Sequence, residues 1–465
     1  MGIVRSTSVS TLENVSCVSV IGLGKLGSPM VACFASKGFR VIGVDVNPEF
    51  VAKINAGEAP VFEPGLSERL HDFRSRISGT ENYSAAISES QASFIIVPTP
   101  SQADGWFSNG YVIDACKCIG EVLKNKSAYH LVVITSTVMP GATDGIIRQT
   151  LEQASGKKVG SDFGLCYSPE FIALGSVIRD FLKPDFVLLG ESDSRAGDLL
   201  SSIYQKVCEN NPPIARMSLV NAELTKISVN TYVTMKITFA NILARICERL
   251  PAADADVVAS AMGKDTRIGT KYLKGSLGYG GPCFPRDNLA FSRLARSLGA
   301  PAVLAESTDT LNRAQVREIS EIVERRLPRG AKIGILGLSY KPNTDVVEES
   351  QGLELARALS ASGFDVQAFD PAAGARAEQA LAGSRVRIAG SMSECCDGVQ
   401  GLLITTPWPE FSRLPWERLN GKTGLILDCW RILDPEIVQA EARCEYLTLG
   451  RYLGQESVRQ ERVPL

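Results

Sequence analysis

The fold is decided by residues 18–27, which read Val18-Ser-Val-Ile-Gly-Leu-Gly-Lys-Leu-Gly27. The apolar, β-branched start predicts a strand, and the glycines after it predict a tight loop. Apolar residues then recur at helical spacing across 30–35, and a second short apolar run, Val41–Val44, ends at Asp45. Strand, glycine loop, helix, strand and acid together make a βαβ unit.

Each part of this unit has a physical role in binding a dinucleotide. Gly22 permits the tight turn, Gly24 lets the backbone approach a pyrophosphate, and Gly27 allows the helix to pack closely on the strand. The helix N-terminus offers unpaired N–H groups to the phosphates. Asp45 lies where a carboxylate accepts hydrogen bonds from the adenine-side ribose and repels a 2′-phosphate, which predicts NAD rather than NADP. The competing interpretation is a glycine-rich turn that serves packing alone.

Further apolar runs alternate with helical stretches along the next part of the chain. They are Phe94–Val97, Leu131–Ile134 and Phe186–Leu189. This alternation predicts a parallel sheet with helices on both faces. Ligands bind such sheets at the carboxyl ends of the strands, which places Thr99 and Thr137 near the reactive end of the cofactor. Ordinary turn chemistry also explains Thr99 taken alone.

The pattern changes around residue 212. Asn211-Pro-Pro213 breaks the alternation, and residues 221–250 contain neither glycine nor proline, which predicts one long helix. We therefore expect an α/β protein with two Rossmann-like, doubly wound parallel-sheet domains joined by a long central helix and a helical middle domain. The expected domains are residues 1–212 (NAD-binding), 213–313 (helical, supporting a dimer and containing Cys283) and 314–465 (Rossmann-like).

The C-terminal region repeats the first pattern in a weaker form. A strand at Lys332–Leu338 contains the turn G-I-L-G-L, which lacks the full glycine fingerprint. Its expected continuation is a helix at about 351–361 and strands at 364–369, 402–405 and 425–428. A degraded nucleotide-binding domain fits this pattern better than a second NAD site.

The chain contains twelve cysteines but only two histidines, His71 and His130. No C-x-x-C pair occurs, so the spacing does not predict a zinc site. The net charge of −2 offers no bulk field for nucleic acid or an anionic membrane. No apolar run is long enough to span a bilayer, and the first sixteen residues contain no apolar signal core. We expect a cytoplasmic protein with reduced thiols and no metal.

The second informative stretch is Gly275-Ser-Leu-Gly-Tyr-Gly-Gly281, followed by Cys283, Arg286 and Asp287. A glycine-rich loop can bring backbone N–H groups against a ligand. Arg286 would favour the thiolate of Cys283, and Asp287 could orient or deprotonate a water. We interpret Cys283 as a nucleophile and the other eleven cysteines as small buried apolar residues.

These motifs resemble the UDP-glucose/GDP-mannose dehydrogenase family of nucleotide-sugar 6-dehydrogenases. The resemblance extends from Val18 to about Leu433. Besides the glycine fingerprint, the motifs that carry it, in the family's order, are Val61-Phe-Glu-Pro-Gly65, Ser136-Thr-Val138, Ser168-Pro-Glu-Phe171, Ala222-Glu-Leu-Thr-Lys-Ile227 with Asn230, the loop from Gly278 to Asp287, and Gly337-Leu-Ser-Tyr-Lys341.

The resemblance implies a four-electron oxidation of the sugar C6 alcohol to a carboxylate by two NAD⁺. After the first oxidation, Cys283 would trap the aldehyde as a thiohemiacetal. The second oxidation would give a thioester, which water hydrolyses. The thiol makes chemical sense because an aldehyde lacks the added nucleophile that oxidation to the acid level requires.

The resemblance also implies the remaining catalytic roles. Lys226 and Asn230, four residues apart on a helix, would stabilise the developing oxyanion and position water. The spacing alone would favour a solvated lysine and a helix-surface asparagine. Glu170 would be the general base or hold the water that acts as base, and Thr137 and Asp287 would orient water.

The fingerprint and the resemblance together indicate the ligand contacts. For NAD they are Gly22, Gly24, Lys25, Leu26, Gly27, Asp45, Thr99, Thr137 and Arg286. For the nucleotide sugar they are Glu170, Phe171, Lys226, Asn230, Arg267, Tyr272, Leu273, Lys274, Gly280, Lys341 and Arg431. Arg267 would reach the substrate of a neighbouring subunit, so a homodimer or a larger homo-oligomer is expected.

Three positions depart from the family pattern and bear on the substrate. Arg286 stands where a lysine is most frequent, Leu174 where UDP-glucose members commonly carry a second glutamate, and Glu348 where an arginine is common. Ser168–Phe171 and the run after it favour UDP-glucose, with a UDP-N-acetylhexosamine or GDP-mannose as alternatives. The other hypotheses are a two-electron β-hydroxyacid dehydrogenase, which needs no thiol, and a non-catalytic NAD-binding regulatory protein.

Overall fold

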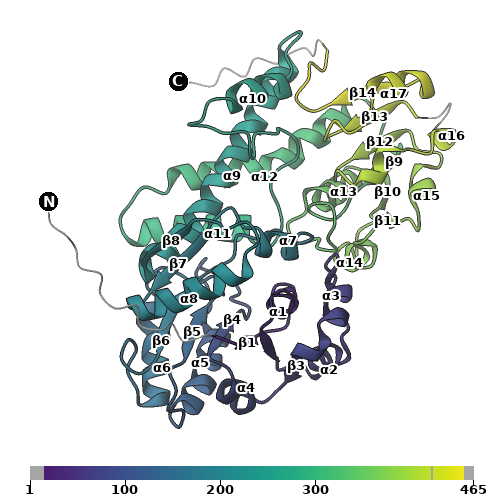
Figure 1. Cartoon of the computed structure of the whole chain (residues 1–465). Coiled ribbons are helices and arrows are strands. Elements are labelled where there is room, and N and C mark those ends of the chain that lie inside the picture. The colour runs from purple at the N-terminus through teal and green to yellow at the C-terminus, as the bar shows by residue number, and fades with distance from the viewer. Residues whose placement is uncertain (1–14, 420–422, 455–465) are drawn as a thin grey trace. The chain divides into compact units, whose positions relative to one another are not determined.

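The structure, a computed structural model, describes residues 15–419 and 423–454 (Figure 1). The chain divides into two compact units, Met1–Ser228 and Val229–Leu465. A long helix, α9 (Leu219–Arg249), begins in the first unit and ends in the second. Within the described segments no helix combines the length and the apolar character needed to cross a bilayer.

The first unit contains an eight-stranded sheet with the strand order β3-β2-β1-β4-β5-β6-β7-β8. Its first six strands are parallel and have the order of a dinucleotide-binding Rossmann fold. The strands are β1 Cys17–Ile21, β2 Arg40–Val44, β3 Ile77–Thr80, β4 Ala92–Ile95, β5 Leu131–Ile134, β6 Gly164–Tyr167, β7 Val187–Glu191 and β8 Ile214–Ser218.

The sheet departs from the sequence expectation at its far edge. β7 pairs antiparallel with β6, and β8 pairs parallel with β7. The expectation of an entirely parallel sheet is therefore wrong for the β6–β7 pair. The expected break at Asn211–Pro213 is also wrong, because β8 follows these prolines directly and extends the same sheet.

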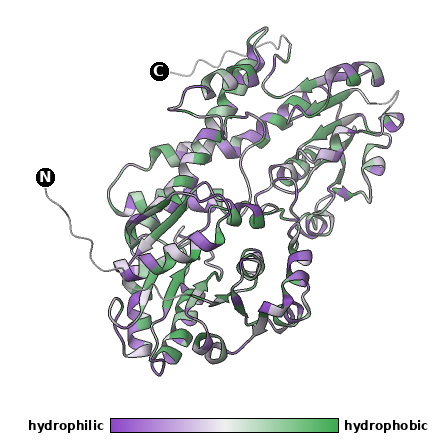
Figure 2. Ribbon diagram, in the orientation of Figure 1, coloured by the Kyte–Doolittle hydropathy of each residue, from purple (hydrophilic) through white to green (hydrophobic). Residues whose placement is uncertain are grey.

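Both faces of the first sheet are buried, because alternate residues of each central strand enter different apolar clusters. In β1, Val18 and Val20 belong to one cluster and Cys17 and Ile21 to the other. β4 and β5 divide their residues in the same way. The strands accordingly appear as hydrophobic segments in Figure 2. Burial on both faces is the physical reason that these runs are almost continuously apolar.

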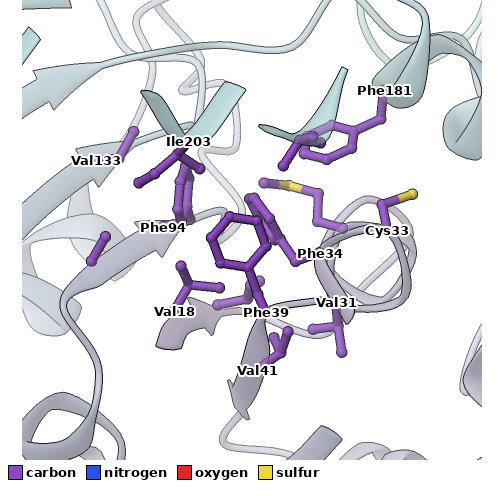
Figure 3. Close-up of a cluster of buried hydrophobic side chains, with 14 of the residues drawn as sticks. Val18, Val31, Cys33, Phe34, Phe39, Val41, Phe94, Val133, Phe181 and Ile203 are labelled. Atoms are coloured by element: carbon purple, nitrogen blue, oxygen red, sulfur yellow. The ribbon is translucent and has the colours of Figure 1, made fainter. Parts of the chain in front are cut away.

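Phe34 of helix α1 (Gly27–Ser36) lies at the centre of one of these clusters (Figure 3). Its ring centroid lies 5.7 Å from that of Phe39, 4.8 Å from Phe94 and 5.4 Å from Phe181. All four rings are fully buried. Through this cluster α1, the helix that follows the glycine loop, packs on β1 and β4.

The remaining helices of the first unit lie between the strands in sequence. Several begin at a side-chain cap; Asp193, for example, accepts a hydrogen bond from the Ala196 N–H at the start of α8. They are α2 Pro48–Ala56, α3 Leu66–Asp72, the 3₁₀ turn Arg74–Arg76, α4 Tyr83–Glu89, α5 Gly110–Leu123, the π-helical turn Thr143–Ile147, α6 Arg148–Ser155, α7 Val177–Leu182 and α8 Ser194–Val207.

The second unit contains a six-stranded parallel sheet with the order β11-β10-β9-β12-β13-β14. This order repeats that of the first six strands of the first sheet. The strands are β9 Lys332–Leu336, β10 Asp365–Phe369, β11 Arg387–Ile388, β12 Gly401–Ile404, β13 Leu425–Asp428 and β14 Glu445–Thr448. The prediction of two Rossmann-like α/β regions is thus confirmed.

Helices make up the rest of the second unit, and the part before β9 is entirely helical apart from its loops. The predicted helix at 221–250 is confirmed to within two residues as α9. The other helices are α10 Ala255–Gly263, α11 Phe284–Ser297, α12 Val303–Glu324, α13 Gln351–Ala361, α14 Gly374–Ala380, α15 Met392–Cys396, the 3₁₀ turn Pro409–Ser412, α16 Trp416–Leu419 and α17 Pro435–Glu441.

Replacing Phe34 with alanine should lower the free energy of unfolding of the first unit by about 3–5 kcal/mol, because the cavity would lie among three fully buried rings. Urea unfolding monitored by circular dichroism measures this change. Phe62→Ala is the matched control, since Phe62 is 55% exposed and its loss should change stability by less than about 0.5 kcal/mol. Equal effects of the two substitutions would contradict the assignment of Phe34 to the core.

Candidate active site

The glycine loop after β1 has three glycines with three different surroundings. Gly22 has φ +101°, and a Cβ there would lie 2.8 Å from the Ile96 carbonyl oxygen. A Cβ at Gly27 would lie 1.8 Å from the Gly22 carbonyl oxygen, so only glycine fits. A Cβ at Gly24 would meet no described protein atom within 4 Å. The described chain leaves open space at position 24, which is compatible with the predicted approach of a pyrophosphate to this loop.

Asp45 follows β2 beside this loop. Its Oδ2 accepts a hydrogen bond from the Leu23 N–H at 2.6 Å, and its Oδ1 accepts one from the Asn47 N–H at 2.8 Å. The carboxylate is half-buried, and each oxygen has a further lone pair. Asp45 therefore holds the glycine loop and can still accept from ribose hydroxyls.

The loops that follow β4 and β5 are tied together. The Thr99 hydroxyl donates to the Thr137 carbonyl oxygen at 2.7 Å. Ser136 adds a second link, because its hydroxyl donates to the Val97 carbonyl oxygen at 2.7 Å. The structure thus gives Thr99 a structural role, whereas the half-buried Thr137 side chain has no hydrogen-bond partner within the described residues.

Glu170 lies in the loop after β6 and has an unusual environment. The Tyr204 hydroxyl of α8 donates to its Oε1 at 3.0 Å, and the Lys226 ammonium of α9 donates to its backbone carbonyl oxygen at 2.7 Å. Burial raises the pKa of Glu170 to about 7, against the opposing influence of the Tyr204 hydrogen bond and the Lys226 charge. A carboxyl with this pKa can take up and release a proton near neutral pH.

Lys226 is buried and contacts the same loop twice. Besides the Glu170 carbonyl oxygen, its ammonium lies 4.5 Å from the centroid of the Phe171 ring. The structure therefore brings together Glu170, Phe171 and Lys226, as the sequence predicted for a substrate-contacting group. Tyr204 was missed, because a tyrosine on the buried face of an amphipathic helix has no distinctive sequence signal.

Two further carboxylates hold the loops of this site and were not identified as site residues. Glu223 is fully buried and accepts from the Gly141 and Thr143 N–H groups at 2.6 and 2.7 Å. Glu63 accepts from the Gly175 and Val177 N–H groups, both at 2.7 Å. Both glutamates lie within the motifs quoted for the family resemblance, which is the signal that could have found them.

In the second unit, Cys283 lies at the N-terminus of α11 and is exposed, whereas the other eleven cysteines are buried or half-buried. All twelve lie in the described part of the chain, and none is in a disulfide. Burial raises the pKa of Cys33 and of Cys396 to about 12, so these thiols stay protonated. The positive end of the α11 dipole instead stabilises negative charge on the Cys283 sulfur.

Asp287, one helical turn after Cys283, is completely buried. Its Oδ2 accepts from the Asn230 side-chain amide at 2.6 Å, and its Oδ1 accepts from the Arg286 guanidinium at 3.2 Å. Its backbone N–H donates to the Cys283 carbonyl oxygen at 2.8 Å. Asn230, Cys283 and Asp287 thus form one connected group within the second unit.

The glycine loop before Cys283 packs against protein rather than presenting its N–H groups to a ligand. The Gly281 N–H donates to the Glu348 carbonyl oxygen at 3.0 Å, and the Tyr279 N–H donates to the Asn312 side chain at 2.8 Å. A Cβ at Gly280 would lie 2.2 Å from the Glu349 carbonyl oxygen. The expectation of an N–H cradle is therefore wrong for Tyr279 and Gly281.

The other predicted sugar-nucleotide contacts of this unit have diverse environments. Tyr272, with φ +64°, and Lys274 are exposed, and Leu273 is buried between them. Arg267 is exposed and pairs with Asp265, with NH2 to Oδ2 at 2.6 Å. Lys341 is half-buried beside the Tyr340 ring.

Arg431, the remaining predicted contact of this unit, is tied to three other segments of the protein. Its guanidinium is buried and forms a two-nitrogen pair with Asp256 of α10 at 2.7 and 2.9 Å. It also donates to the Leu449 carbonyl oxygen at 2.5 Å and the Gly275 carbonyl oxygen at 2.8 Å. These contacts hold the second unit together around Arg431, and its predicted contact with the nucleotide sugar stays a prediction.

The second sheet has an acid at the position equivalent to Asp45, but this acid is fully used by the protein. Asp370 follows β10 and is buried. Its Oδ2 accepts from the Leu338 N–H, the Ser339 N–H and hydroxyl, and the Trp408 indole, and its Oδ1 accepts from two further N–H groups. No acceptor position is left for a ribose, which supports the view that this domain does not bind a second dinucleotide in the same way.

The chain matches three models of one protein family. Residues 16–208 match the NAD binding domain of the UDP-glucose/GDP-mannose dehydrogenase family, residues 220–314 its central domain, and residues 334–435 its UDP binding domain.

Curated relatives with two different sugar substrates are similar to the chain. UDP-glucose 6-dehydrogenase AglM of Haloferax volcanii is 34% identical over 90% of this chain and 97% of its own length. GDP-mannose 6-dehydrogenase of Pseudomonas aeruginosa is 35% identical over 76% of this chain and 80% of its own length. Identity alone therefore does not separate the two substrates.

Among solved structures, a UDP-glucose dehydrogenase from the hyperthermophilic archaeon Pyrobaculum islandicum is similar to the chain with a TM-score of 0.85 and 35% identity. The match covers 96% of this chain and all of the archaeal chain. Sequence and fold thus agree over nearly the whole length.

Replacing Gly24 with alanine should leave folding intact but raise the Kd for NADH about tenfold or more, because the methyl group would enter the open space predicted to hold the pyrophosphate. Fluorescence titration with NADH and the thermal midpoint measure the two effects. Gly27→Ala is the contrasting variant, since its methyl group would collide with the Gly22 carbonyl oxygen and lower the thermal midpoint. Unchanged NADH binding by Gly24→Ala would contradict a pyrophosphate at this loop.

Proposed function

The chain belongs to the UDP-glucose/GDP-mannose dehydrogenase family, and we propose that it oxidises the C6 alcohol of UDP-glucose to the carboxylate with two NAD⁺. The observation that carries the proposal is Cys283, the exposed cysteine at the N-terminus of α11, with the buried Asp287 one turn away. A two-electron dehydrogenase has no use for such a thiol.

The first unit has the features that NAD requires. The space at Gly24 suits a pyrophosphate, and Asp45 suits the adenine-side ribose. Lys25 and Leu26 lie in the turn of the same loop, and Gly27 is the first residue of α1. When bound there, NAD⁺ would supply the hydride acceptor for the two oxidations at C6.

Cys283 is proposed to act on the aldehyde that the first oxidation produces. Its sulfur adds to C6, and the aldehyde oxygen takes up a proton, which gives a thiohemiacetal. The second oxidation removes the C6 hydrogen and the hydroxyl proton and leaves a thioester. Water then adds to C6 and the C–S bond breaks, which releases the carboxylate and regenerates the thiol. Each sugar therefore consumes one water and two NAD⁺.

Proton transfer and charge stabilisation are assigned to the polar groups of each unit. In the first unit, Glu170 is the proposed general base, or it holds the water that acts as the base. Lys226 is proposed to stabilise the oxyanion, and Thr137 is proposed to orient a water. In the second unit, Asn230 and Asp287 are proposed to stabilise the oxyanion and to position the water that hydrolyses the thioester. Their hydrogen bond fixes both side chains in place.

UDP-glucose is proposed as the sugar nucleotide for two reasons. The archaeal UDP-glucose dehydrogenase and the Haloferax relative match the chain over nearly its full length, and the C-terminal region matches a UDP binding domain. The proposed substrate contacts are Phe171, Glu170, Lys226, Asn230, Arg267, Tyr272, Leu273, Lys274, Gly280 and Lys341. GDP-mannose is the second candidate, because curated GDP-mannose 6-dehydrogenases are equally identical over a shorter span.

The purified protein, mixed with NAD⁺ and UDP-glucose, should form two NADH per sugar consumed, measured by absorbance and by quantifying the uronic acid. GDP-mannose and UDP-N-acetylhexosamines, tested in parallel, should be poorer substrates in kcat/KM. One NADH per sugar, or turnover of none of these nucleotide sugars, would contradict the four-electron reaction.

Cys283→Ala should reduce uronic acid formation by roughly 10³-fold or more, because the aldehyde would lose its nucleophile. The matched control is Cys444→Ala, which removes a half-buried thiol of the same unit and should retain the wild-type rate. Uronic acid formation at the wild-type rate by Cys283→Ala would overturn the thioester route.

A homodimer is also proposed, from an apolar stripe on α9 in the second unit. Tyr232, Phe239, Ile242, Ile246 and, directly after the helix, Leu250 are between 36% and 58% exposed. Their spacing of seven, three, four and four residues places them on one helical face. A stripe of this size is costly to leave in water, and a second copy of the chain can cover it.

The protein should therefore sediment as a dimer of about 100 kDa, twice the 50.0 kDa chain. Phe239→Asp combined with Ile246→Asp should produce a folded monomer, because buried carboxylates would oppose association. Ile437→Asp, at an exposed apolar position on α17, is the control and should not change the mass. A monomeric wild-type protein would contradict the proposal.

A further inference from the structure

A chain of polar groups runs inward from Glu170. Its Oε1 lies 3.0 Å from the Tyr204 hydroxyl, which lies 3.0 Å from the Ser168 hydroxyl. The Ser168 hydroxyl lies 3.0 Å from the Leu188 carbonyl oxygen of β7. Tyr204 and Ser168 are 3% and 1% exposed, so bulk solvent has little access to their hydroxyls. The four groups belong to the first unit.

The number of hydrogens in this chain matters. Each hydroxyl has one hydrogen to donate and can accept as well. The Ser168 hydrogen has two acceptors within reach, the Tyr204 oxygen and the Leu188 carbonyl oxygen. When Glu170 is ionised, Ser168 donates to Tyr204 and Tyr204 donates to Glu170. When Glu170 carries a proton on Oε1, every donor can turn the other way, so that Glu170 donates to Tyr204, Tyr204 to Ser168, and Ser168 to Leu188.

We propose that this hydrogen-bond chain reverses its direction when Glu170 gains or loses a proton, so that Tyr204 and Ser168 are positioning residues that satisfy the carboxyl in both states. The inference rests on the proposed function only for the step that uses the proton. Oε2 has no hydrogen-bond donor among the described residues and is the oxygen open to a substrate or a water. Rotation about the terminal torsion, which has a broad two-fold potential, then exchanges the two oxygens and turns an accepted proton inward.

Three titratable groups near Glu170, namely Cys33, Cys208 and Tyr204, have raised pKa values. Lys226 of α9 supplies the nearby positive charge. Burial raises the pKa of Cys33 on α1 to about 12 and that of Cys208 after α8 to about 11. Burial and the Glu170 charge also raise the pKa of Tyr204, so the phenol keeps its proton. Glu170 is therefore the group in this cluster that titrates near pH 7.

Two substitutions should shift the pKa of Glu170 in opposite directions. Tyr204→Phe removes the donor to the carboxylate, and a hydrogen bond to a charged acceptor is worth more than one to a neutral acceptor, so the pKa should rise. Ser168→Ala removes the acceptor that the Tyr204 hydrogen needs when Glu170 is protonated. One buried hydrogen would then have no acceptor in the protonated state alone, so the pKa should fall.

Infrared difference spectra of the protein without substrate measure the titration, through the carbonyl stretch of a protonated carboxyl. Subtracting the spectra of Glu170→Gln isolates the Glu170 signal. The wild type should titrate near pH 7, Tyr204→Phe higher and Ser168→Ala lower. The acidic limb of the pH profile of kcat should move in the same two directions.

Ser201→Ala is the matched control. It removes a buried hydroxyl one turn before Tyr204 on α8, and that hydroxyl donates to the Gly197 carbonyl oxygen at 2.7 Å. Its titration should equal that of the wild type. Tyr204→Phe keeps the aromatic ring, whose centroid lies 6.4 Å from that of Phe181, so the packing is retained, and circular dichroism checks that each variant folds.

If the two substitutions shifted the pKa of Glu170 in the same direction, or did not shift it, the proposed reversal of the hydrogen-bond chain would be wrong. An unchanged or higher pKa in Ser168→Ala would mean that the proton stays on the outer oxygen, and this result alone overturns the proposal even if Tyr204→Phe does not fold. Failure of the proposed function has a different signature, because the infrared titration would remain while no nucleotide sugar is oxidised.

Discussion

The loops that carry the site depend on buried carboxylates that accept hydrogen bonds from backbone N–H groups. Glu223 holds the loop after β5, Glu63 holds the loop before α7, and Asp370 holds the turn after β9. A loop at the carboxyl edge of a sheet has N–H groups that no strand pairs with, and an ionised acceptor binds them more strongly than a neutral one. Without these acids the segments around Thr137 and Phe171 would lose their fixed positions.

Hydrogen bonds to a carboxylate also distinguish the two sheets, although the second sheet repeats the order of the first six strands of the first. Asp45 accepts one N–H on each oxygen and keeps lone pairs for a ribose. Asp370 accepts from six donors and is buried, so it serves the protein alone. Glu170 differs from both, because its environment raises its pKa to about 7 and thereby suits it to proton transfer rather than to anchoring. The donors around an acid and its burial together distinguish these three carboxyl groups.

Sequence reasoning located the local motifs well and the distant partners poorly. The βαβ unit, the long helix α9 and most central strands were predicted to within a few residues, because apolar periodicity and glycine positions are local signals. The edge strands β3, β8, β11 and β14 were missed, since short or partly polar edge strands are specified by pairing with a neighbour, and the interior four-residue strand β6 was missed as well. Arg431 was assigned to the substrate, whereas its partner Asp256 lies far away in sequence and could not be recognised.

The sequence by itself determined the two α/β regions, the NAD fingerprint, the glycine-rich loop before Cys283 and the resemblance to nucleotide-sugar dehydrogenases. These features consist of residues that are close in the chain, so their spacing is visible without a structure. The tertiary structure alone decided that Cys283 is the exposed cysteine, that Asn230 holds Asp287, and that Tyr204 and Ser168 lie behind Glu170. Exposure and hydrogen bonding depend on which distant segments pack together. Local spacing in the sequence does not reveal that packing.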